Sequence, residues 1–589
     1  MKYKLYKGTI PEYSALQQIL YNRGIPVEEQ EKWLNAGWDD IHDWRLFGKN
    51  IEDALNFITN AVSKKKKMLI LWDSDPDGAF SGAIINNFLY AYFPEYAEVC
   101  VENIFHTGKQ HGLGEFDLDR IAAKCDVIWI PDASSSDYKE LEYLYNKGKE
   151  ILITDHHLAD KVSPHAIVIN NQLCDYPDKN LSGAGVTWQV CRAWEERYKD
   201  KSTPIAKNLL DLCAVGNVSD MMNSQELEVK AIVNLGLNNL KNKFLLEIAK
   251  KHSYSIAKMN GLNYYSCAFY ITPYLNCIFR SGTKDEKELV FNSLLDKNNN
   301  QEVRSSKRGE KEKYIPIYEE AVTITERVKR RQTKEQDEMV ELFEQKIKEE
   351  NLLNNAILTF ICVPYEIPQN LAGLIANKEQ AKYQRPCLVL TERQDETGKI
   401  VYEGSGRNYS LSEKENLMKE LLATGCVNWV RGHENAHGVS IDEDKFKEFL
   451  KKFNEQYKDV DQTPTYWVDY IWNSRTLDGS KILDIADLNI YGQEIPESLV
   501  VVKDIPLSSN LVTLMGLEKG HPTLKIDLGN GVSAIKFKSS EEEWEKFCDD
   551  SKTLTIVAKC NKNEWNGNIS AQLIVEDYEL TEQEEEWIF

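Results

Sequence analysis

Residues 68–78 read MLILWDSDPDG, an uninterrupted apolar run that ends in three closely spaced aspartates. A run without polar alternation is typical of a strand buried on both faces of a parallel sheet. The pattern returns twice: the mainly apolar residues 126–130 lead to Asp132, and the mainly apolar residues 150–154 lead to the sequence DHH at 155–157. Because ligands gather beyond the carboxyl ends of parallel strands, we expect these polar side chains to lie together at one sheet edge.

The segments between these runs have helical character. Residues 78–93 and 136–147 read as helices, and a further apolar run covers 166–169. Alternating strands and helices of this kind predict an α/β domain with a parallel sheet flanked by helices. A later apolar stretch, 209–218, leads to Asp220, which we expect at the same edge of the sheet.

Clustered carboxylates repel one another and lose hydration when buried, and divalent cations offset both costs. Carboxylate and imidazole donors suit Mn²⁺ or Mg²⁺ better than Zn²⁺, which favours thiolates. Two such ions, roughly 3.5–4 Å apart, activate a water and stabilise the leaving oxygen of a phosphoryl displacement. The expected ligands of the two ions are Asp75, Asp77, Asp132, His156 and Asp220. Alone, DSDPDG is equally compatible with a plain turn, but its register with the other polar strand ends favours the metal site.

Composition limits the class of protein. A chain of 589 residues is expected to form three or four domains at about 150 residues each. Its 71 Lys and Arg against 93 Asp and Glu give a net charge of −22, which argues against binding to nucleic acid or membrane by bulk charge. No run reaches the roughly 18 apolar residues of a membrane span, and the start has no signal-peptide core. The 12 cysteines form no C-x-x-C pair, so we expect a cytoplasmic protein without disulfides and without membrane contact.

The second half of the chain changes character. Residues 304–350 are highly charged, gain helical periodicity and predict a long connecting helix. Apolar segments resume at 356–362 and 386–390, and a glycine-rich stretch covers 404–438. From about residue 465 short apolar runs alternate with turns, which predicts a small β-barrel or sandwich.

The motifs together resemble a known superfamily. DSDPDG, Asp132, Asp155-His156-His157 and Val218-Ser219-Asp220 are similar in order and spacing to the motifs of the DHH phosphoesterases. The segment LSGAGV at 181–186 resembles the one found at this place in RecJ-type single-strand exonucleases. Three later motifs resemble the DHH-associated substrate-binding domain: Gly373-Leu374-Ile375-Ala376, Gly404-Ser405-Gly406-Arg407 and Gly432-His433. The closing β-rich part is similar to the OB-fold that RecJ adds to these two domains.

This resemblance implies a fold class and a domain order. The class is α/β, with a parallel-sheet DHH catalytic domain, a long connecting helix, an α/β DHH-associated substrate-binding domain and a C-terminal OB-like β-barrel. The expected boundaries are 1–50 for a helical N-terminal lead-in, 51–300 for the catalytic domain, 301–350 for the connecting helix, 351–455 for the substrate-binding domain, 465–580 for the barrel and 581–589 for an acidic tail.

The resemblance also implies roles for single residues. The five metal ligands keep that role, Asp73 and Asp155 ligate metal or orient the ligands, and His157 faces the scissile phosphate. Contacts to the substrate are expected from Arg407, His433, Gly404, Ser405, Gly406, Gly432, Lys378 and Lys109. A glycine-rich turn with a surface arginine is the alternative for this second group.

Some positions depart from the RecJ pattern. Arg431 replaces one of two glycines, His437 stands where a small residue is usual, and Lys378 stands where arginine is common. The loop at 112–114 lacks the usual phosphate-binding arginine and has only Lys109 and histidines nearby. These differences concern recognition of a 5′ phosphate, whereas the hydrolytic motifs are complete.

The predicted function is a two-metal phosphodiesterase: a RecJ-like exonuclease that hydrolyses single-stranded DNA, 5′→3′ by family analogy, and releases mononucleotides in DNA recombination, repair or replication. Two other functions stay open. One is a DHH phosphodiesterase acting on short oligonucleotides or cyclic dinucleotides, and the other is a non-catalytic nucleic-acid-binding scaffold. The acidic end at 581–589 resembles the tail of bacterial single-strand-binding proteins. It is a docking segment for a single-strand-binding protein or another repair factor, a segment that folds back as a mimic of DNA, or a solvated terminus.

Overall fold

The computed structural model describes residues 1–106, 111–114, 116–199, 204–310, 312–368, 370–395, 397–414 and 416–582. The chain divides into two compact units. The aspartate-rich unit comprises Glu28–Gln332 and Asn489–Pro496, and the C-terminal unit comprises Met1–Val27, Thr333–Leu488 and Glu497–Phe589. The expected substrate residue Lys109 and most of the expected acidic tail lie outside the described residues.

A five-stranded parallel sheet forms the centre of the aspartate-rich unit, as predicted, with the strand order β3-β2-β4-β5-β6. The strands are β2 (Met68–Trp72), β3 (Val101–Phe105), β4 (Val127–Pro131), β5 (Glu150–Asp155) and β6 (Ile167–Asn170). Every residue of β2 and β4 is buried, which explains their uninterrupted apolar runs. The edge strand β3 was not predicted, because its side chains are only partly buried and include the exposed Glu102.

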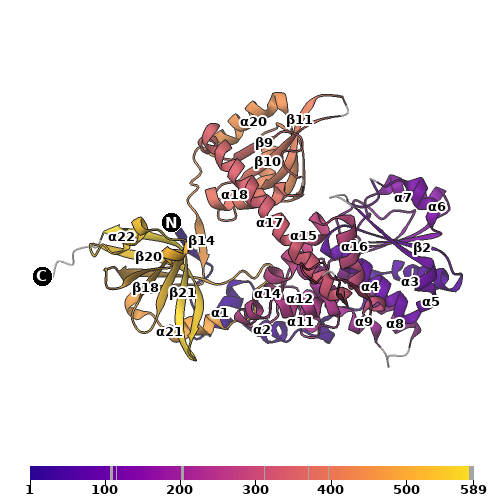
Figure 1. Ribbon diagram of the computed structural model, residues 1–589, viewed down its shortest axis with the longest axis horizontal. Coiled ribbons are helices and arrows are strands. Elements are labelled where there is room, and N and C mark those ends of the chain that lie inside the picture. The colour runs from indigo at the N-terminus through magenta and orange to yellow at the C-terminus, as the bar shows by residue number, and fades with distance from the viewer. Residues whose placement is uncertain are drawn as a thin grey trace. The chain divides into compact units, whose positions relative to one another are not determined.

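Helices cover both faces of this sheet (Figure 1). Leu69 and Leu71 of β2 pack with α6 (Leu118–Lys124) and α7 (Tyr138–Asn146) on one face. Met68, Ile70 and Trp72 point the other way, because side chains alternate along a strand. They share a core with the helices α3 (Asn50–Ser63), α4 (Pro76–Tyr92), α5 (Pro94–Cys100) and α8 (Gly183–Tyr198).

The apolar stretch before Asp220 is a helix buried on all sides, α10 (Leu210–Ser219), which packs on α4 and α8. A helix in this position can be apolar all round because no face of it meets water. The other helices of the unit are α2 (Val27–Leu34), α9 (Ile205–Asn208), α11 (Leu227–Leu237), α12 (Lys243–Lys251), α13 (Ser253–Lys258), α14 (Tyr264–Tyr270), α15 (Thr272–Ser281) and α16 (Lys284–Ser293).

The long connecting helix exists but begins later than predicted. The strands β7 (Glu302–Arg304) and β8 (Tyr314–Pro316) form an antiparallel hairpin, and α17 (Ile317–Glu349) follows it. Gly309 at positive φ turns the hairpin. Pro316 stands directly before the helix, where its missing N–H costs nothing and where it disfavours a helical backbone at Ile315. Charge composition alone did not reveal this boundary.

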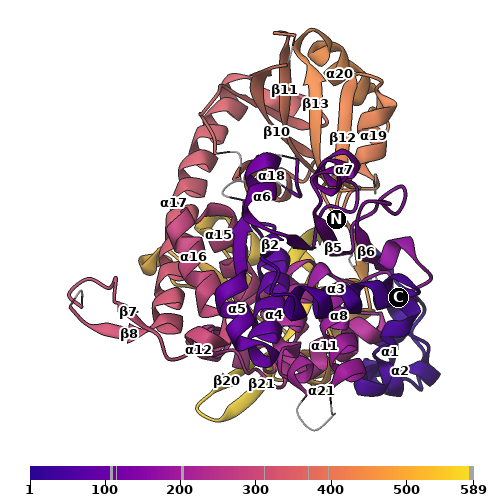
Figure 2. The same cartoon turned by 90° about the vertical axis from the view of Figure 1, so that its right-hand side faces the viewer.

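The first sheet of the C-terminal unit has five strands in the order β12-β13-β11-β10-β9. They are β9 (Leu358–Cys362), β10 (Cys387–Gln394), β11 (Ile400–Arg407), β12 (Val427–His433) and β13 (Ala436–Asp442). The helix α18 (Ala372–Tyr383) and the end of α17 cover one face. The helices α19 (Leu417–Ala423) and α20 (Glu443–Gln456) cover the other face, as Figure 2 shows beside β12 and β13.

The second sheet has seven strands in the order β15-β16-β20-β21-β19-β18-β17. They are β15 (Tyr470–Asn473), β16 (Leu499–Pro506), β17 (Val512–Met515), β18 (Thr523–Asp527), β19 (Ser533–Phe537), β20 (Lys552–Trp565) and β21 (Asn568–Glu582), with α21 (Gly479–Ala486) and α22 (Glu541–Phe547) beside them. Among the described residues no pairing joins β15 to β17, so the predicted barrel is an OB-like sheet that stays open.

The start of the chain is tied to this part of the unit. The strand β1 (Lys2–Leu5) pairs in parallel with β14 (Thr465–Val468), so the predicted helical lead-in begins with a strand. The helix α1 (Ala15–Asn22) follows, and Arg23 beyond it donates from Nη1 and Nη2 to the two carboxylate oxygens of Asp469 at 2.7 and 2.9 Å. Both side chains are buried, which makes this bidentate ion pair a specific anchor for the N-terminal segment.

No helix in the described part of the chain is both long and apolar enough to cross a membrane.

Candidate active site

Asp73 holds the loop that follows β3. Its Oδ1 accepts a hydrogen bond from the Gly112 backbone N–H at 3.1 Å, and its Oδ2 contacts His111 Nδ1. Gly112 has a φ of 66°, a backbone conformation that favours glycine. Both oxygens of Asp73 therefore hold this loop, and the role expected for Asp73, to ligate metal or to orient the metal ligands, stays a prediction.

Asp75 is the N-cap of α4. Its Oδ1 accepts from the Gly78 N–H at 3.1 Å, and Pro76 occupies the first turn, where its missing N–H costs nothing. A Cβ at Gly78 would lie 2.6 Å from the Asp73 carbonyl oxygen, so the motif needs glycine there. The letters DSDPDG thus describe a strand that turns tightly into a capped helix.

Asp77 is held by the start of another helix. The backbone N–H groups of Gly183 and Ala184, at the N-terminus of α8, donate to its two oxygens at 2.7 and 3.2 Å. Burial, followed by the charge of Asp75, raises the pKa of Asp77 to about 6. A Cβ at Gly216 would come within 2.7 Å of Asp77 Oδ1, so α10 also depends on glycine to approach the carboxylate.

Asp132 follows β4 in a strained conformation. Its φ is 61°, which is uncommon for a residue other than glycine. A Cβ at Gly183 would lie only 2.4 Å from the Asp132 side chain, so the LSGAGV segment packs directly on it. Asp132 Oδ1 is buried without a hydrogen-bond partner among the described residues. Burial, together with the charges of Asp77 and Asp75, raises the pKa of Asp132 well above its usual range.

His156 joins two carboxylates from different segments. Its Nε2 lies 3.3 Å from Asp132 Oδ1 and 3.4 Å from Asp220 Oδ2. Burial, followed by the charge of His157, lowers the pKa of His156 to about 4, which leaves a neutral imidazole. Its Nε2 is buried without a hydrogen-bond partner in the described part of the chain, so its lone pair is available to a ligand.

Asp155 and His157 form an orienting pair. Asp155 is fully buried and accepts hydrogen bonds from the backbone N–H groups of Ser135, His156 and His157 and from His157 Nδ1 at 2.8 Å. Burial opposes ionisation of Asp155, but the hydrogen bond and charge of His157 outweigh it and lower the pKa. Partial burial likewise opposes the charge of His157, and Asp155 outweighs it to raise the pKa of His157 to about 9.

The cluster fits divalent cations. Two sets of side chains place one donor atom each within 4.8 Å of one another: Asp132, His156 and His157, and Asp77, His156 and Asp220. The carboxylates raise one another's pKa, and buried ligand atoms beside them lack hydrogen-bond partners among the described residues. A cation that binds there stabilises both groups. The mixture of carboxylate oxygens with imidazole and no thiolate suits Mn²⁺ or Mg²⁺.

The second group of expected residues lies in the C-terminal unit. Ala436 of the middle strand β13 lies opposite Arg407 of β11 on one side and opposite His433 of β12 on the other. The side chains of Arg407 and His433 therefore share one face and one end of the sheet. The Arg407 Nη1 donates to the Gly406 carbonyl at 2.7 Å. A Cβ at Gly373 would lie 2.5 Å from Arg407 Nη2, so the guanidinium packs against the first turn of α18.

The glycines of this group permit close packing of the backbone. A Cβ at Gly404 would overlap the Val389 carbonyl, and Gly432 has a φ of 125°. Ser405 lies two residues from Arg407 on β11 and therefore points to the same face. Lys378 is exposed on α18, and its Nζ pairs with Asp337 at 2.9 Å.

One residue at this site escaped the sequence analysis. Lys287 of α16 is fully buried, and its Nζ donates to Ser74 Oγ at 2.7 Å, inside the DSDPDG motif. Ser74 in turn donates to the Phe279 carbonyl at 2.8 Å. Lys287 lies more than two hundred residues from the motif in a stretch rich in charge, so only its burial reveals this role.

Comparison with known families agrees with the motifs. The profile of the DHH family, N-terminal domain, matches residues 67–217, and that of the RecJ OB domain matches residues 468–577. The SPbeta prophage-derived single-strand DNA-specific exonuclease YorK of Bacillus subtilis (strain 168) is 31% identical over 587 residues, which cover 98% of each chain. The single-stranded-DNA-specific exonuclease RecJ of Escherichia coli (strain K12) is 24% identical over 610 residues, covering 95% of each chain.

Solved structures share the fold. RecJ of Thermus thermophilus in complex with Mn²⁺ has a TM-score of 0.70 at 19% identity, covering 99% of this chain and 80% of that one. The same protein in complex with Mg²⁺ has a TM-score of 0.63 at 17% identity, covering 99% and 79%. These two ions agree with the predicted divalent cofactor. With the same domain order and full-length similarity to YorK, the chain belongs to the RecJ-like family of single-strand DNA-specific exonucleases within the DHH superfamily.

Proposed function

We propose that the protein is a metal-dependent exonuclease that degrades single-stranded DNA from the 5′ end and releases mononucleotides. The observation that carries this proposal is the meeting of Asp77, Asp132 and Asp220 around His156, with buried donor atoms that lack hydrogen bonds among the described residues. Similarity to YorK over 98% of the chain supports the choice of single-stranded DNA as the substrate.

The metal ligands in this proposal are Asp75, Asp77, Asp132, His156 and Asp220. Bound there, two divalent ions would lower the pKa of a water and offset the charge that develops on the phosphate. The chain itself fixes the donors in advance: α8 holds Asp77 by two backbone N–H groups, and β5 positions His156 beside Asp132. Such prior orientation limits the reorganisation needed during the reaction.

His157 has a different role in this proposal. Asp155 accepts from its Nδ1, which fixes the ring and favours the protonated imidazole. The side chain is half exposed, so Nε2 is available to donate to an oxygen of the scissile phosphate. Asp73 supports the same site by holding the His111–Gly112 loop.

In the C-terminal unit we propose that the substrate contacts the sheet face that Arg407 and His433 share. A guanidinium provides two parallel N–H donors to phosphate oxygens, and Arg407 carries this fork beside the start of α18. Gly404, Gly406 and Gly432 keep the backbone beside Arg407 closely packed, and direct contact of these glycines with the substrate stays a prediction. Lys378 adds a point charge, and we keep Lys109 as a predicted contact.

The setting we propose is the cytoplasm, in DNA recombination, repair or replication. The twelve cysteines are unpaired, which agrees with a reducing compartment. Docking of a single-strand-binding protein or another repair factor on the acidic tail stays a prediction, tested by deleting residues 582–589.

The direct test follows cleavage of one 30-nucleotide single strand labelled at either its 5′ or its 3′ end, with Mn²⁺ present. Controls are the same strand in a blunt duplex, a trinucleotide, and the reaction in EDTA. The proposal expects labelled mononucleotide at once from the 5′ label and progressively shortened products from the 3′ label. Cleavage confined to the trinucleotide would replace it with a small-substrate phosphodiesterase, and tight strand binding without cleavage would replace it with a scaffold.

A further inference from the structure

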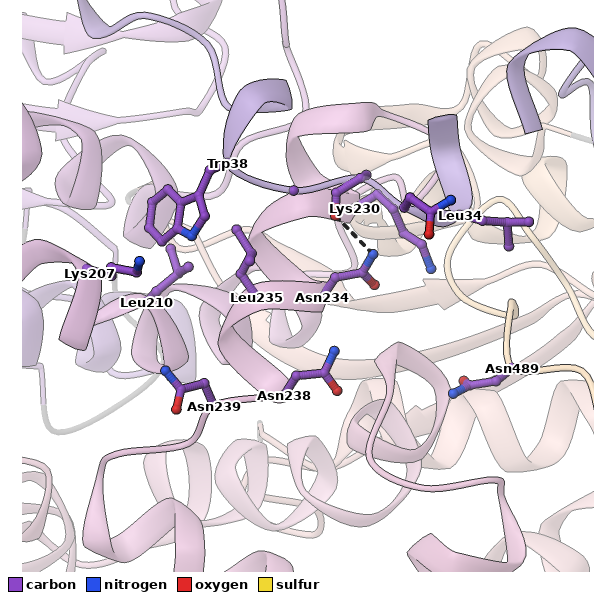
Figure 3. A pocket seen from close by; sticks show the side chains of 13 residues that line it. Leu34, Trp38, Lys207, Leu210, Lys230, Asn234, Leu235, Asn238, Asn239 and Asn489 are labelled. Carbon is purple, nitrogen blue, oxygen red and sulfur yellow. Dashed lines mark hydrogen bonds between the residues drawn. The ribbon is translucent and has the colours of Figure 1, made fainter. Parts of the chain in front are cut away.

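A separate pocket of about 540 Å³ opens in the aspartate-rich unit (Figure 3). Its walls come from residues 34–38 before and at the start of the short helix η1 (Trp38–Asp40), from α9, α10 and α11, and from Asn489. Leu210 at the first turn of α10 lines it, whereas Asp220 lies just past the other end. Ten residues at a rise of about 1.5 Å each place this wall about 15 Å from the metal cluster. The pocket is therefore distinct from the candidate active site.

The lining is rich in hydrogen-bonding groups and carries positive charge. It contains five asparagines, two lysines and one tryptophan, and no carboxylate: Asn35, Asn234, Asn238, Asn239, Asn489, Lys207, Lys230 and Trp38. The chain as a whole has a net charge of −22, so a pocket with two cations and no acid is locally opposite in sign. A lining of this kind attracts an anion that also offers polar edges.

The polar groups are arranged in order rather than scattered. Lys230, Asn234 and Asn238 follow one another at intervals of four residues, so they form one stripe along α11. The other face of α11 is fixed on α10, since a Cβ at Gly236 would lie 2.5 Å from Ala214 Cβ. Asn234 Nδ2 donates to the Ala36 carbonyl at 3.3 Å, the dashed line in Figure 3, and joins this stripe to the opposite wall.

Neither lysine of the pocket has an ion pair in the described part of the chain. Lys230 Nζ lies 4.2 Å from the Trp33 ring centroid, and burial lowers the pKa of Lys230 to about 8. Lys207 Nζ lies 4.9 Å from the Trp38 ring centroid and is exposed. A partly desolvated ammonium without a carboxylate beside it gains stability when an anion arrives.

We propose that this pocket binds a nucleotide unit, either within single-stranded DNA or as a free mononucleotide, with its phosphate at Lys207. Asparagine amides offer both donors and acceptors, as the edge of a base requires. Trp38 supplies an apolar wall for the base, and aromatic rings with nearby cations are typical of single-strand sites. The volume lies within the roughly 300–1,000 Å³ of small-molecule sites.

A phosphate ion would need the cations alone and would leave the five amides unused. The choice of a nucleotide over another polar anion rests in part on the proposed function, which generates mononucleotides and handles single strands.

The test uses the full chain in EDTA, so that hydrolysis is off. Two probes are offered: 5-iodo-2′-deoxyuridine 5′-monophosphate and a 12-nucleotide strand containing one 5-iododeoxyuridine. Light-induced crosslinks are mapped to peptides, and affinity is measured by calorimetry. We expect crosslinks on the peptides that contain residues 34–38 or 227–239. Crosslinking of the mononucleotide identifies free nucleotide as a ligand, and crosslinking of the strand alone identifies DNA.

The double variant Lys207→Ala/Asn238→Ala should weaken crosslinking of the bound probe at these peptides at least tenfold. Both side chains are exposed, so the fold should persist. The matched control, Lys297→Ala/Asn300→Ala, removes an exposed lysine and asparagine of the same unit outside the pocket and should change nothing. Wild-type crosslinking in the pocket variant, equal losses in both variants, or no crosslink at these peptides would overturn the proposal.

A separate assay keeps this inference distinct from the proposed function. Both double variants and the wild type are given a trinucleotide and a 30-nucleotide strand with Mn²⁺. Crosslinking at the pocket without hydrolysis by the wild type would reject the proposed function alone. Hydrolysis by the wild type without crosslinking at the pocket would reject the pocket proposal alone.

Discussion

The His157 Nδ1 atom donates to Asp155 Oδ1 at 2.8 Å, and the same oxygen also accepts from the backbone N–H groups of both histidines of the DHH sequence. One buried carboxylate therefore fixes the backbone that presents His156 and the ring of His157. Exchange of Asp155 for asparagine keeps the size of the side chain but removes its charge. We expect Asp155→Asn to lower kcat by about 10²–10⁴-fold, the usual contribution of an oriented proton-transfer group.

The measurement is steady-state nucleotide release with saturating Mn²⁺, next to a circular dichroism spectrum that confirms folding. Asp160→Asn, an exposed aspartate a few residues away, is the control. Wild-type kcat in folded Asp155→Asn would show that this pair has no part in turnover.

Lys287 holds the DSDPDG loop through its hydrogen bond to Ser74 Oγ. Lys287→Met keeps most of the volume but removes the donor, so the loop and its aspartates should lose their orientation. Groups that orient metal ligands typically contribute 10–100-fold in metal affinity. We therefore expect the Mn²⁺ concentration for half-maximal activity to rise by at least tenfold.

The control for this prediction is Lys284→Met, which alters an exposed lysine of the same helix. Calorimetric titration of Mn²⁺ gives a readout that does not depend on turnover. Equal Mn²⁺ affinity in the wild type and in folded Lys287→Met would show that Lys287 only fills space.

Glu228 makes stability depend on pH. It is buried, accepts from Tyr176 Oη and Gln189 Nε2 at 2.7 Å each, and burial raises its pKa from 4.5 to about 8. The folded protein then holds this proton more tightly than the unfolded chain. The contribution of Glu228 to the free energy of unfolding is complete below pH 4.5. It is lost as the pH rises to about 8, at up to about 1.4 kcal/mol per pH unit.

Urea denaturation of the full chain at pH 5.5, 6.5, 7.5 and 8.5 measures this effect. Glu228→Gln should flatten the decline of stability over that range, and the exposed Glu98→Gln should leave it unchanged. A steeper decline of stability with pH in Glu228→Gln would mean that folding does not raise the pKa of Glu228.

Asp469 anchors the N-terminal segment through Arg23. Removing one partner of a buried ion pair leaves the other charge uncompensated and typically costs about 3–5 kcal/mol. We expect Asp469→Ala to lower the free energy of unfolding by this amount. The urea concentration at the unfolding midpoint should fall with it. Asp461→Ala breaks the exposed pair with Lys2 and should not shift the midpoint measurably. Equal midpoints for the two variants would show that burial of the Arg23 pair contributes nothing.

The sequence predicted the parallel sheet and its polar edge because both follow from local pattern. β2 and β4 are buried on both faces, so their apolar runs are unbroken. The strand-end rule then placed Asp132 and His156 near each other, as the 3.3 Å separation of their side chains shows. Their roles as metal ligands remain predictions.

Other features had no local signal. The exposed Glu102 concealed the edge strand β3, and Lys287 reaches Ser74 only through tertiary packing. The anchoring of Asp77 by α8 joins residues about a hundred positions apart. The amide-lined pocket gathers four separate segments, so no single stretch of the sequence indicates it.

In the proposed function, the Asp and His cluster is a metal centre for hydrolysis of single-stranded DNA. The most direct test compares nucleotide release from 5′-labelled single-stranded DNA at saturating Mn²⁺ by the wild type, Asp75→Ala and His156→Ala. We expect release by the wild type and a loss of at least about 10³-fold in both variants, which should remain folded. Activity within tenfold of the wild type in both folded variants would contradict it.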